Sequence, residues 1–251
     1  MSKINCGILF NAKQNYFLPY LKWIIDQEAS SKSFKISRIH TNDTKIVKNS
    51  FDKINCANSL EEVIEHSDIV FSLGYWRLIK KKLISKVPRG IINIHHSYKL
   101  KYKGRYCSTW ALKHKEAVHG STLHFIDEHL DEGKIIDTRC FGIHSGDTAE
   151  DIFFKANNLG LKILKENFNS ILFGEIDEFV SHDKNSFNFK GADLSHEIPI
   201  QSVKNKDDLL REICSLTFDK KPAPYVILNG HKVFLKLESY DDGYLRKQKH
   251  A

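Results

Sequence analysis

The first 175 residues alternate between short apolar runs and segments with apolar residues at helical spacing. The apolar runs predict buried strands, and the spaced segments predict amphipathic helices. We expect strands at 4–10, 34–40, 68–73 and 90–94, and helices at 16–25 and from Ser59 to Ile64. Ser59 and Glu62 have the spacing of a capping box at the start of the second helix. This order predicts an α/β fold with a mostly parallel sheet, whose ligands bind at the carboxyl ends of its strands.

The same alternation continues to about residue 175 and then changes. We expect a helix at 109–118, strands at 121–126 and 134–143, and a long helix that begins at a capping box of Asp147 and Glu150. Short strand-like pieces follow, including a hairpin-like segment around Asn229 and Gly230. We therefore predict a catalytic domain at 1–184 and a small, mostly β domain at 185–251.

Composition narrows the class of protein. The chain has 251 residues, of which 41% are hydrophobic and 27% charged, and no apolar run approaches the length of a membrane span. The apolar stretch near its N-terminus is too short, and polar residues follow too early, for a secretory signal. We therefore expect a cytoplasmic protein. Five scattered cysteines without a C-x-x-C pair favour core residues over a disulfide framework or a zinc site. A net charge of +7 favours anionic partners, such as nucleic acid, phosphorylated small molecules or polyglutamylated folate.

Candidate chemistry lies at the end of the strand at 90–94. Asn93 and His95 are two positions apart, so on an extended strand they point the same way. An amide N–H beside an imidazole suits acyl transfer, because the amide stabilises an oxyanion and the ring manages a proton. Asp131, in the turn LDEG, is the candidate carboxylate that orients the ring. The alternative is a turn-capping asparagine followed by a histidine that only packs.

Two blocks of sequence carry a family resemblance. The first is Asn93, Ile94, His95, His96 and Ser97, followed by KLKYKG, and the second is Gly120, Thr122 and His124, followed by Leu130, Asp131 and Gly133. Both blocks resemble motifs of the formyltetrahydrofolate-dependent formyltransferases. The first is similar to the family's N-I-H-P-S followed by a segment that ends in glycine, and the second is similar to its G-x-T-x-H followed by L-D-x-G. That family includes glycinamide ribonucleotide, methionyl-tRNA and sugar N-formyltransferases. The resemblance covers most of residues 1–175 and implies a Rossmann-like formyltransferase domain.

The resemblance also implies roles for individual residues. Asn93, His95 and Asp131 match the family's catalytic residues. The segment GYWRLI at 74–79 is similar to the one whose backbone holds the pterin ring of the formyl donor. The implied folate-binding residues are Arg77, Leu78, Ile79 and the supporting His124. The sequence departs from the family pattern at His96, where proline is usual, and at Tyr98 and Lys99, where leucines are usual.

The formyl acceptor is inferred from the remaining residues. Lys99, Lys101, Lys103 and Arg105 recur at period two, so an extended loop would line its cations along one side, facing the oxygens of a nucleotide diphosphate. The alternative is a solvated charged loop. We assign Ser97, Lys101, Lys103 and Gly104 to the substrate site. The chain is most similar to enzymes that formylate nucleotide-linked amino sugars, of the dTDP-sugar type, for surface polysaccharides such as the O-antigen of lipopolysaccharide.

Two other functions stay open. One is formylation of charged initiator tRNA, although tRNA-modifying relatives are usually longer. The other is a protein that binds folate or a nucleotide without turnover. The sequence predicts no metal site, because the histidines at 114, 119, 124 and 129 share no face of a helix or strand. We expect no membrane partner, and the resemblance implies a homodimer.

Overall fold

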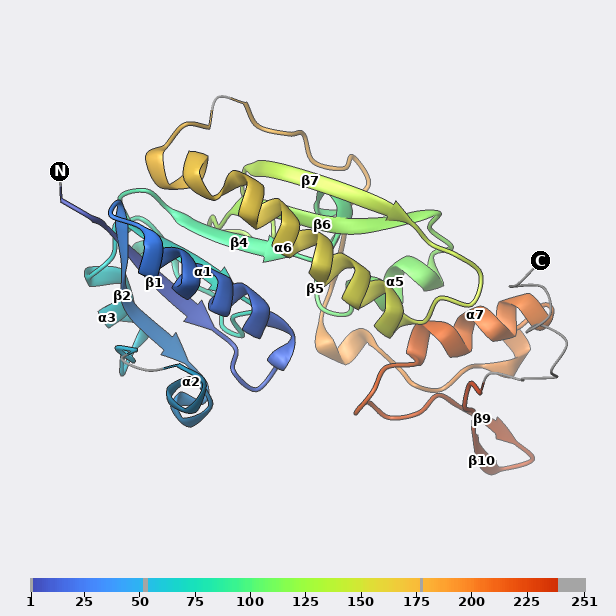
Figure 1. Ribbon diagram of the computed structural model, residues 1–251. Helices are drawn as coiled ribbons and strands as arrows, with labels where there is room; N and C mark the ends of the chain where they lie inside the picture. Colours follow the sequence, from blue (N-terminus) through green and yellow to red (C-terminus); the bar gives the residue numbers. More distant parts are fainter. Residues whose placement is uncertain (1, 52–53, 177, 239–251) are drawn as a thin grey trace, which may run out of the picture.

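A six-stranded sheet forms the centre of the molecule (Figure 1). The computed structural model describes residues 2–51, 54–176 and 178–238. In spatial order the strands are β2 (Phe34–Thr41), β1 (Ile4–Phe10), β3 (Ile69–Leu73), β4 (Ile91–His95), β6 (Val118–Phe125) and β7 (Ile135–Gly142). The first four are parallel, and β6 is antiparallel to both β4 and β7. The predicted α/β fold with a mostly parallel sheet is therefore confirmed.

Helices cover both faces of the sheet. The helices α1 (Leu18–Ser30) and α6 (Ala149–Phe173) lie together over one face (Figure 1), where Trp23 of α1 contacts Phe168 of α6 edge-on. Against the other face lie α3 (Leu60–Glu65) and α4 (Lys81–Ile84). Each face buries its own apolar core, so the strands are apolar on both sides.

The alternation of side chains along β4 decides which face carries the candidate chemistry. Ile92 and Ile94 belong to the core under α1 and α6, whereas Ile91 belongs to the core under α3. Because successive residues of a strand point to opposite faces, Asn93 and His95 project to the side away from α6.

Helix starts and ends differ from the predictions in a few places. The helix α5 (Cys107–Lys113) ends before the predicted Val118, since Val118 already begins β6. The long helix α6 is capped by Thr148 with Asp151 rather than by Asp147 with Glu150. Asp147 instead accepts a hydrogen bond from the His144 N–H and pairs with Lys155. The helix α2 (Thr44–Ser50) was not predicted, and the Asp43 side chain caps its first turn.

The C-terminal part contains a helix as well as strands. Its elements are β8 (Phe187–Phe189), α7 (Lys206–Leu216), β9 (Tyr225–Leu228) and β10 (His231–Phe234). The predicted hairpin is confirmed, and both Asn229 and Gly230 have the positive φ that a tight hairpin turn requires. The helix α7, which packs on α5, was not predicted. The domain boundary after residue 184 stays a prediction. In the described ranges, no helix combines the length and hydrophobicity needed to cross a bilayer.

A close approach of α6 to the sheet occurs at Gly160. A Cβ atom there would lie 2.6 Å from Tyr20 Oη, 2.7 Å from Ser121 Oγ and 2.8 Å from Ile94 Cγ2. The Tyr20 hydroxyl cannot retreat easily, because it donates a hydrogen bond of 2.5 Å to the carbonyl of Asn157. Glycine therefore lets α6 pack directly behind β4 and β6.

We predict that Gly160→Ala destabilises the protein. Overpacking at this contact should cost about 1–3 kcal/mol of unfolding free energy, despite the better helix propensity of alanine. Urea denaturation measures this change. The exposed Asn158→Ala in the same helix is the matched control and should stay within about 0.5 kcal/mol of the parent. Equal stability of the two variants would contradict the prediction.

Candidate active site

Asn93 and His95 meet their partners through the antiparallel pairing of β4 with β6. Asn93 lies directly opposite His124, and His95 lies opposite Thr122. Directly opposite residues project to the same face, so the imidazole of His124 stands beside the Asn93 amide. Asn93 Nδ2 and His124 Nε2 are 3.1 Å apart.

Hydrogen bonds define the orientation of the Asn93 amide. His124 Nδ1 lies 2.8 Å from the carbonyl of Phe125, so this nitrogen carries the hydrogen and donates it. Nε2 is then an acceptor and takes one hydrogen from Asn93 Nδ2. Burial lowers the pKa of His124 to about 4, consistent with a neutral ring. The second hydrogen of Asn93 Nδ2 has no acceptor among the described residues and is available to a ligand.

His95 lies between a backbone carbonyl and a carboxylate. Its Nε2 donates to the carbonyl of Tyr102 at 2.7 Å, and its Nδ1 lies 3.6 Å from Asp131 Oδ2. The Cys107 Sγ is 3.4 Å from Nε2. Burial opposes the charged form, but Asp131, Cys107 and the Tyr102 carbonyl outweigh burial and raise the pKa of His95 to about 10. The ring is therefore an imidazolium at neutral pH.

Asp131 reaches His95 from the turn between β6 and β7. Its backbone has a left-handed φ of +50°, which is uncommon for a residue with a side chain. Gly133 allows the turn to close, because a Cβ there would lie 1.7 Å from the Phe125 carbonyl oxygen. Asp131 Oδ2 accepts a hydrogen bond of 2.9 Å from the Gly104 N–H, and its Oδ1 is 3.8 Å from His124 Nε2. The structure thus brings Asn93, His95, Asp131 and His124 together.

The residues assigned to the substrate make mainly internal contacts. Ser97 is fully buried, and its hydroxyl accepts a hydrogen bond from the Tyr102 N–H. The ammonium groups of Lys101 and Lys103 pair with Glu116 and Glu132, at 2.7 and 2.8 Å. Their assignment to substrate binding, like that of Gly104, stays a prediction.

The expected extended loop of cations does not form. Lys99 and Leu100 have positive φ values of +50° and +54° within a short 3₁₀ helix, Tyr98–Leu100, so the chain turns there. Extended backbone resumes only at β5 (Tyr102–Gly104). Arg105 is exposed and has no carboxylate within 4 Å among the described residues, so its charge faces solvent.

The predicted folate segment follows β3 at the same edge of the sheet. Leu78 is 77% exposed, whereas Ile79 is buried in the core under α3 and α4. The guanidinium of Arg77 lies 5.7 Å from the Trp76 ring, which stacks on His40. An exposed apolar side chain at the carboxyl edge of the strands fits the apolar part of a folate. The side chain of His124 is only 1% exposed, and its polar contacts include Asn93, Asp131 and the Phe125 carbonyl.

Two residues beside His95 were missed by the sequence analysis. The sequence assigned no role to Tyr102, yet its backbone carbonyl accepts a hydrogen bond from His95. Cys107 was assigned to the core, and it is buried but touches His95. Neither contact leaves a sequence signal, because both depend on how the chain turns between β4 and α5.

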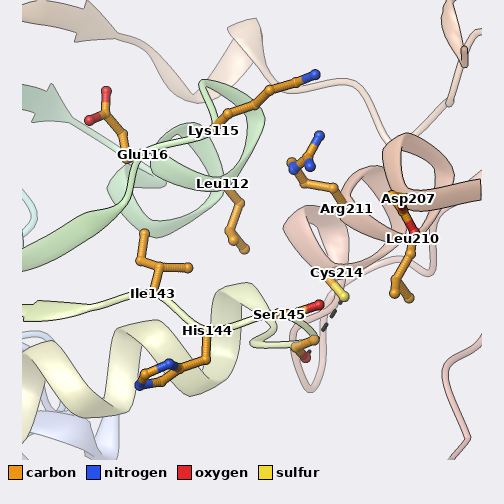
Figure 2. Close-up of a pocket in the computed structure, with 11 residues that line it drawn as sticks. Leu112, Lys115, Glu116, Ile143, His144, Ser145, Asp207, Leu210, Arg211 and Cys214 are labelled. Carbon is orange, nitrogen blue, oxygen red and sulfur yellow. Dashed lines mark hydrogen bonds between the residues drawn. The ribbon is translucent and has the colours of Figure 1, made fainter. Parts of the chain in front are cut away.

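A separate cavity of about 260 Å³ lies between α5, the turn after β7, and α7 (Figure 2). Its apolar lining includes Leu112, Ile143 and Leu210, while Lys115 and Arg211 are charged. Both cations already pair with the Asp208 carboxylate, at 2.9 Å each. None of Asn93, His95 and Asp131 lines this cavity.

Comparison with known proteins decides the family. The model of the family described as formyl transferase matches residues 30–167, which include both sequence blocks. The chain belongs to this family. A methionyl-tRNA formyltransferase of Kosmotoga olearia is 30% identical over 174 residues, which are 69% of this chain and 48% of that protein. The chain spans about half the length of the curated relatives it matches.

Solved structures of family members have the same fold. A 4-N formyltransferase of Francisella tularensis superposes with a TM-score of 0.79 at 18% identity, over 96% of this chain and all of that one. The sugar 3N-formyl transferase WlaRD, solved in the presence of dTDP and 5-N-formyl-THF, has a TM-score of 0.72 at 26% identity. That match covers 93% of this chain and 85% of the other. Of these two structures, WlaRD is described as a sugar formyl transferase, and the Francisella tularensis protein shows the shared fold.

His96, which stands where the formyl transferase family usually has proline, is packed among aromatic rings. The ring stacks on Phe17 at 5.4 Å and meets Phe153 edge-on at 4.9 Å. Its Nε2 is buried without a hydrogen-bond partner in the described part of the chain. Burial, helped by the charge of His95, lowers the pKa of His96 to about 3. His96 is thus a neutral core residue beside the charged His95.

We predict that His96 makes stability fall in acid. Its pKa is about 6.5 when unfolded and lower when folded, so its contribution is fully present above pH 6.5 and is lost as pH falls from 6.5 toward 3. His96→Phe keeps a ring and removes the titration, so the slope of unfolding free energy against pH should fall by up to about 1.4 kcal/mol per pH unit. Urea denaturation from pH 7 to pH 4 measures it. A changed stability with the same slope would contradict the prediction.

Proposed function

We propose that this protein transfers the formyl group of formyltetrahydrofolate to the amine of a nucleotide-diphosphate-linked amino-deoxy sugar. The observation that carries the proposal is the convergence of Asn93, His95 and Asp131 at one edge of a formyl transferase fold. An amide donor and a buried cation can stabilise the oxyanion that forms when an acyl group is transferred to an amine, and a carboxylate can orient the cation or take up a proton.

Each group has a role that follows from its contacts. Attack by the amine on the formyl carbon places negative charge on the formyl oxygen. The free hydrogen of Asn93 Nδ2 donates to that oxygen, and the charge of His95 stabilises it. Such a donor contributes about 2.7–4 kcal/mol to lowering a barrier. A doubly protonated ring cannot accept a further proton, so the amine proton passes to Asp131 or to water. The tetrahedral intermediate then collapses: the bond between the formyl carbon and the donor nitrogen breaks, and that nitrogen takes up the proton from Asp131 or water and leaves as tetrahydrofolate.

The formyl donor occupies the edge of the sheet near Arg77, Leu78 and Ile79. The exposure of Leu78 and the position of this segment after β3, next to β4, support this placement. The presence of 5-N-formyl-THF with WlaRD, which is 26% identical to this chain, supports a folate donor.

The acceptor is proposed to be of the dTDP-sugar type. The structure of WlaRD contains dTDP, and its name describes a sugar formyl transferase. In this chain, Arg105 follows β5 with its charge unpaired among the described residues, which suits a diphosphate. A cytoplasmic location stays a prediction from composition, and a homodimer and a role in O-antigen or lipopolysaccharide synthesis stay predictions of the resemblance.

Methionyl-tRNA formylation is the second candidate, because the curated relatives carry that name. A tRNA enzyme should bind RNA with a steep dependence on salt, whereas a sugar enzyme need not. Binding without turnover is the third candidate.

The test is formyl transfer from formyltetrahydrofolate to thymidine- and uridine-diphosphate amino sugars, with charged initiator tRNA in parallel. Turnover of one nucleotide sugar supports the proposal and identifies the acceptor. Turnover of tRNA alone would overturn the sugar assignment. Folate binding with no turnover of any acceptor would favour the binding protein.

We predict that His95→Ala and Asp131→Asn each lower kcat by about 10²–10⁴-fold with the fold intact. His95→Ala removes the cation, and Asp131→Asn keeps the shape of the side chain but removes the charge that holds the cation. Steady-state kinetics and far-UV circular dichroism measure the two effects. His129→Ala, an exposed histidine near the same turn, is the matched control. Rates near those of the parent in either active-site variant would rule out the assigned roles.

A further inference from the structure

The three-residue strand β5 holds both members of the proposed catalytic ion pair. The carbonyl of Tyr102, at its start, accepts from His95 Nε2 at 2.7 Å. The N–H of Gly104, at its end, donates to Asp131 Oδ2 at 2.9 Å. The acceptor of one charged group and the donor to the other thus lie two residues apart on one strand.

The strand β5 is not part of the six-stranded sheet. Among the described strands it pairs only with β8, which lies more than 80 residues further along the chain. The Phe187 N–H donates to the Lys101 carbonyl at 2.7 Å, and the Arg105 N–H donates to the Phe189 carbonyl at 3.1 Å. These two hydrogen bonds fix β5 at both of its ends. Gly104 permits them, because a Cβ there would lie 2.2 Å from the Phe189 oxygen.

Side chains reinforce the same pairing. The Tyr102 ring is buried and stacks on Phe187 with centroids 5.6 Å apart. The Tyr102 hydroxyl donates to Glu116 at 2.7 Å, and Phe189 stacks on Trp110 at 3.9 Å. Tyr102 is thus held by β8 and by Glu116, which follows α5.

We propose that β8 positions His95 and Asp131 by holding the backbone groups of β5 that bind them. The expected effect of β8 on turnover rests on the proposed function, whereas its effect on the titration of His95 does not. It assigns a role to the C-terminal part of the chain, which the sequence left without one. Phe187 and Phe189 touch neither the formyl donor nor the acceptor in this scheme, and they act through β5.

The titration of His95 reports on this arrangement. The groups around the ring are Asp131 from the turn after β6, Cys107 from α5, His124 from β6, and the nearby His96 and His119. The carbonyl of Tyr102 favours the protonated ring, so weakening that hydrogen bond lowers the pKa of His95.

The experiment compares two proline substitutions in adjacent positions. Phe187→Pro removes the N–H that donates to Lys101 and blocks pairing with β5. Ser186→Pro is the matched control, because the Ser186 N–H donates no hydrogen bond within the described residues. The pKa of His95 is measured by NMR from the Cε1–H resonance that disappears in His95→Gln. We expect Phe187→Pro to lower it by about one unit or more, and Ser186→Pro to leave it unchanged.

Kinetics provide the second measurement. Phe187→Pro should lower kcat about tenfold or more with little change in KM, because the positioned groups act on the reacting atoms. Phe187→Ala keeps the N–H but removes the ring, so it should give a smaller shift of the His95 pKa in the same direction. The exposed Phe173→Ala on α6 is its control.

An unchanged titration of His95 in both Phe187 variants would overturn the inference, as would unchanged kcat in Phe187→Pro. If the parent protein formylates no acceptor, the proposed function fails, but the titration still decides whether β8 positions His95. The two failures are therefore distinguishable.

Discussion

Antiparallel pairing of β4 with β6 is the constraint on which the candidate active site depends. It places His124 opposite Asn93, and the turn that follows β6 then delivers Asp131 to His95. A slip of β6 by one residue against β4 would turn His124 to the other face of the sheet, away from Asn93. The close contact of Gly160 with Ile94 and Ser121, one from each strand, holds this register from behind. The geometry of the site therefore depends on the close packing of α6 against β4 and β6.

The electrostatics of the site follow from burial. A buried ion pair is costly unless hydrogen bonds satisfy both partners, and β5 supplies one to His95 and one to Asp131. The neighbouring His96, His119 and His124 have lowered pKa values, because burial and the charge of His95 disfavour a second cation. One positive charge thus stands among neutral rings, beside an amide with a free hydrogen. That is an environment in which charge on a formyl oxygen would be stabilised.

Much of the fold could be predicted, because strands buried on both faces appear as apolar runs. The six strands of the sheet, α1, α3 and α6 were all expected close to their observed positions. Some of the errors are local and electrostatic in origin. Thr148 and Asp151 cap α6 because Asp147 is engaged by Lys155. The charge pattern also did not reveal that Lys101 pairs with Glu116 and Lys103 with Glu132, while the assignment of both lysines to the substrate site stays a prediction. Charge patterns along a chain do not reveal such partners.

The sequence by itself determined the type of fold, the family and the presence of Asn93, His95 and Asp131 at strand ends and turns. These properties depend on local periodicity and short motifs, which are visible without coordinates. Only the tertiary structure decided that His95 is an imidazolium, that His124 belongs beside Asn93, and that β8 pairs with the strand that holds the ion pair. Those properties depend on backbone groups and buried charges brought together from distant parts of the chain, because a pKa and a hydrogen bond are set by neighbours in space.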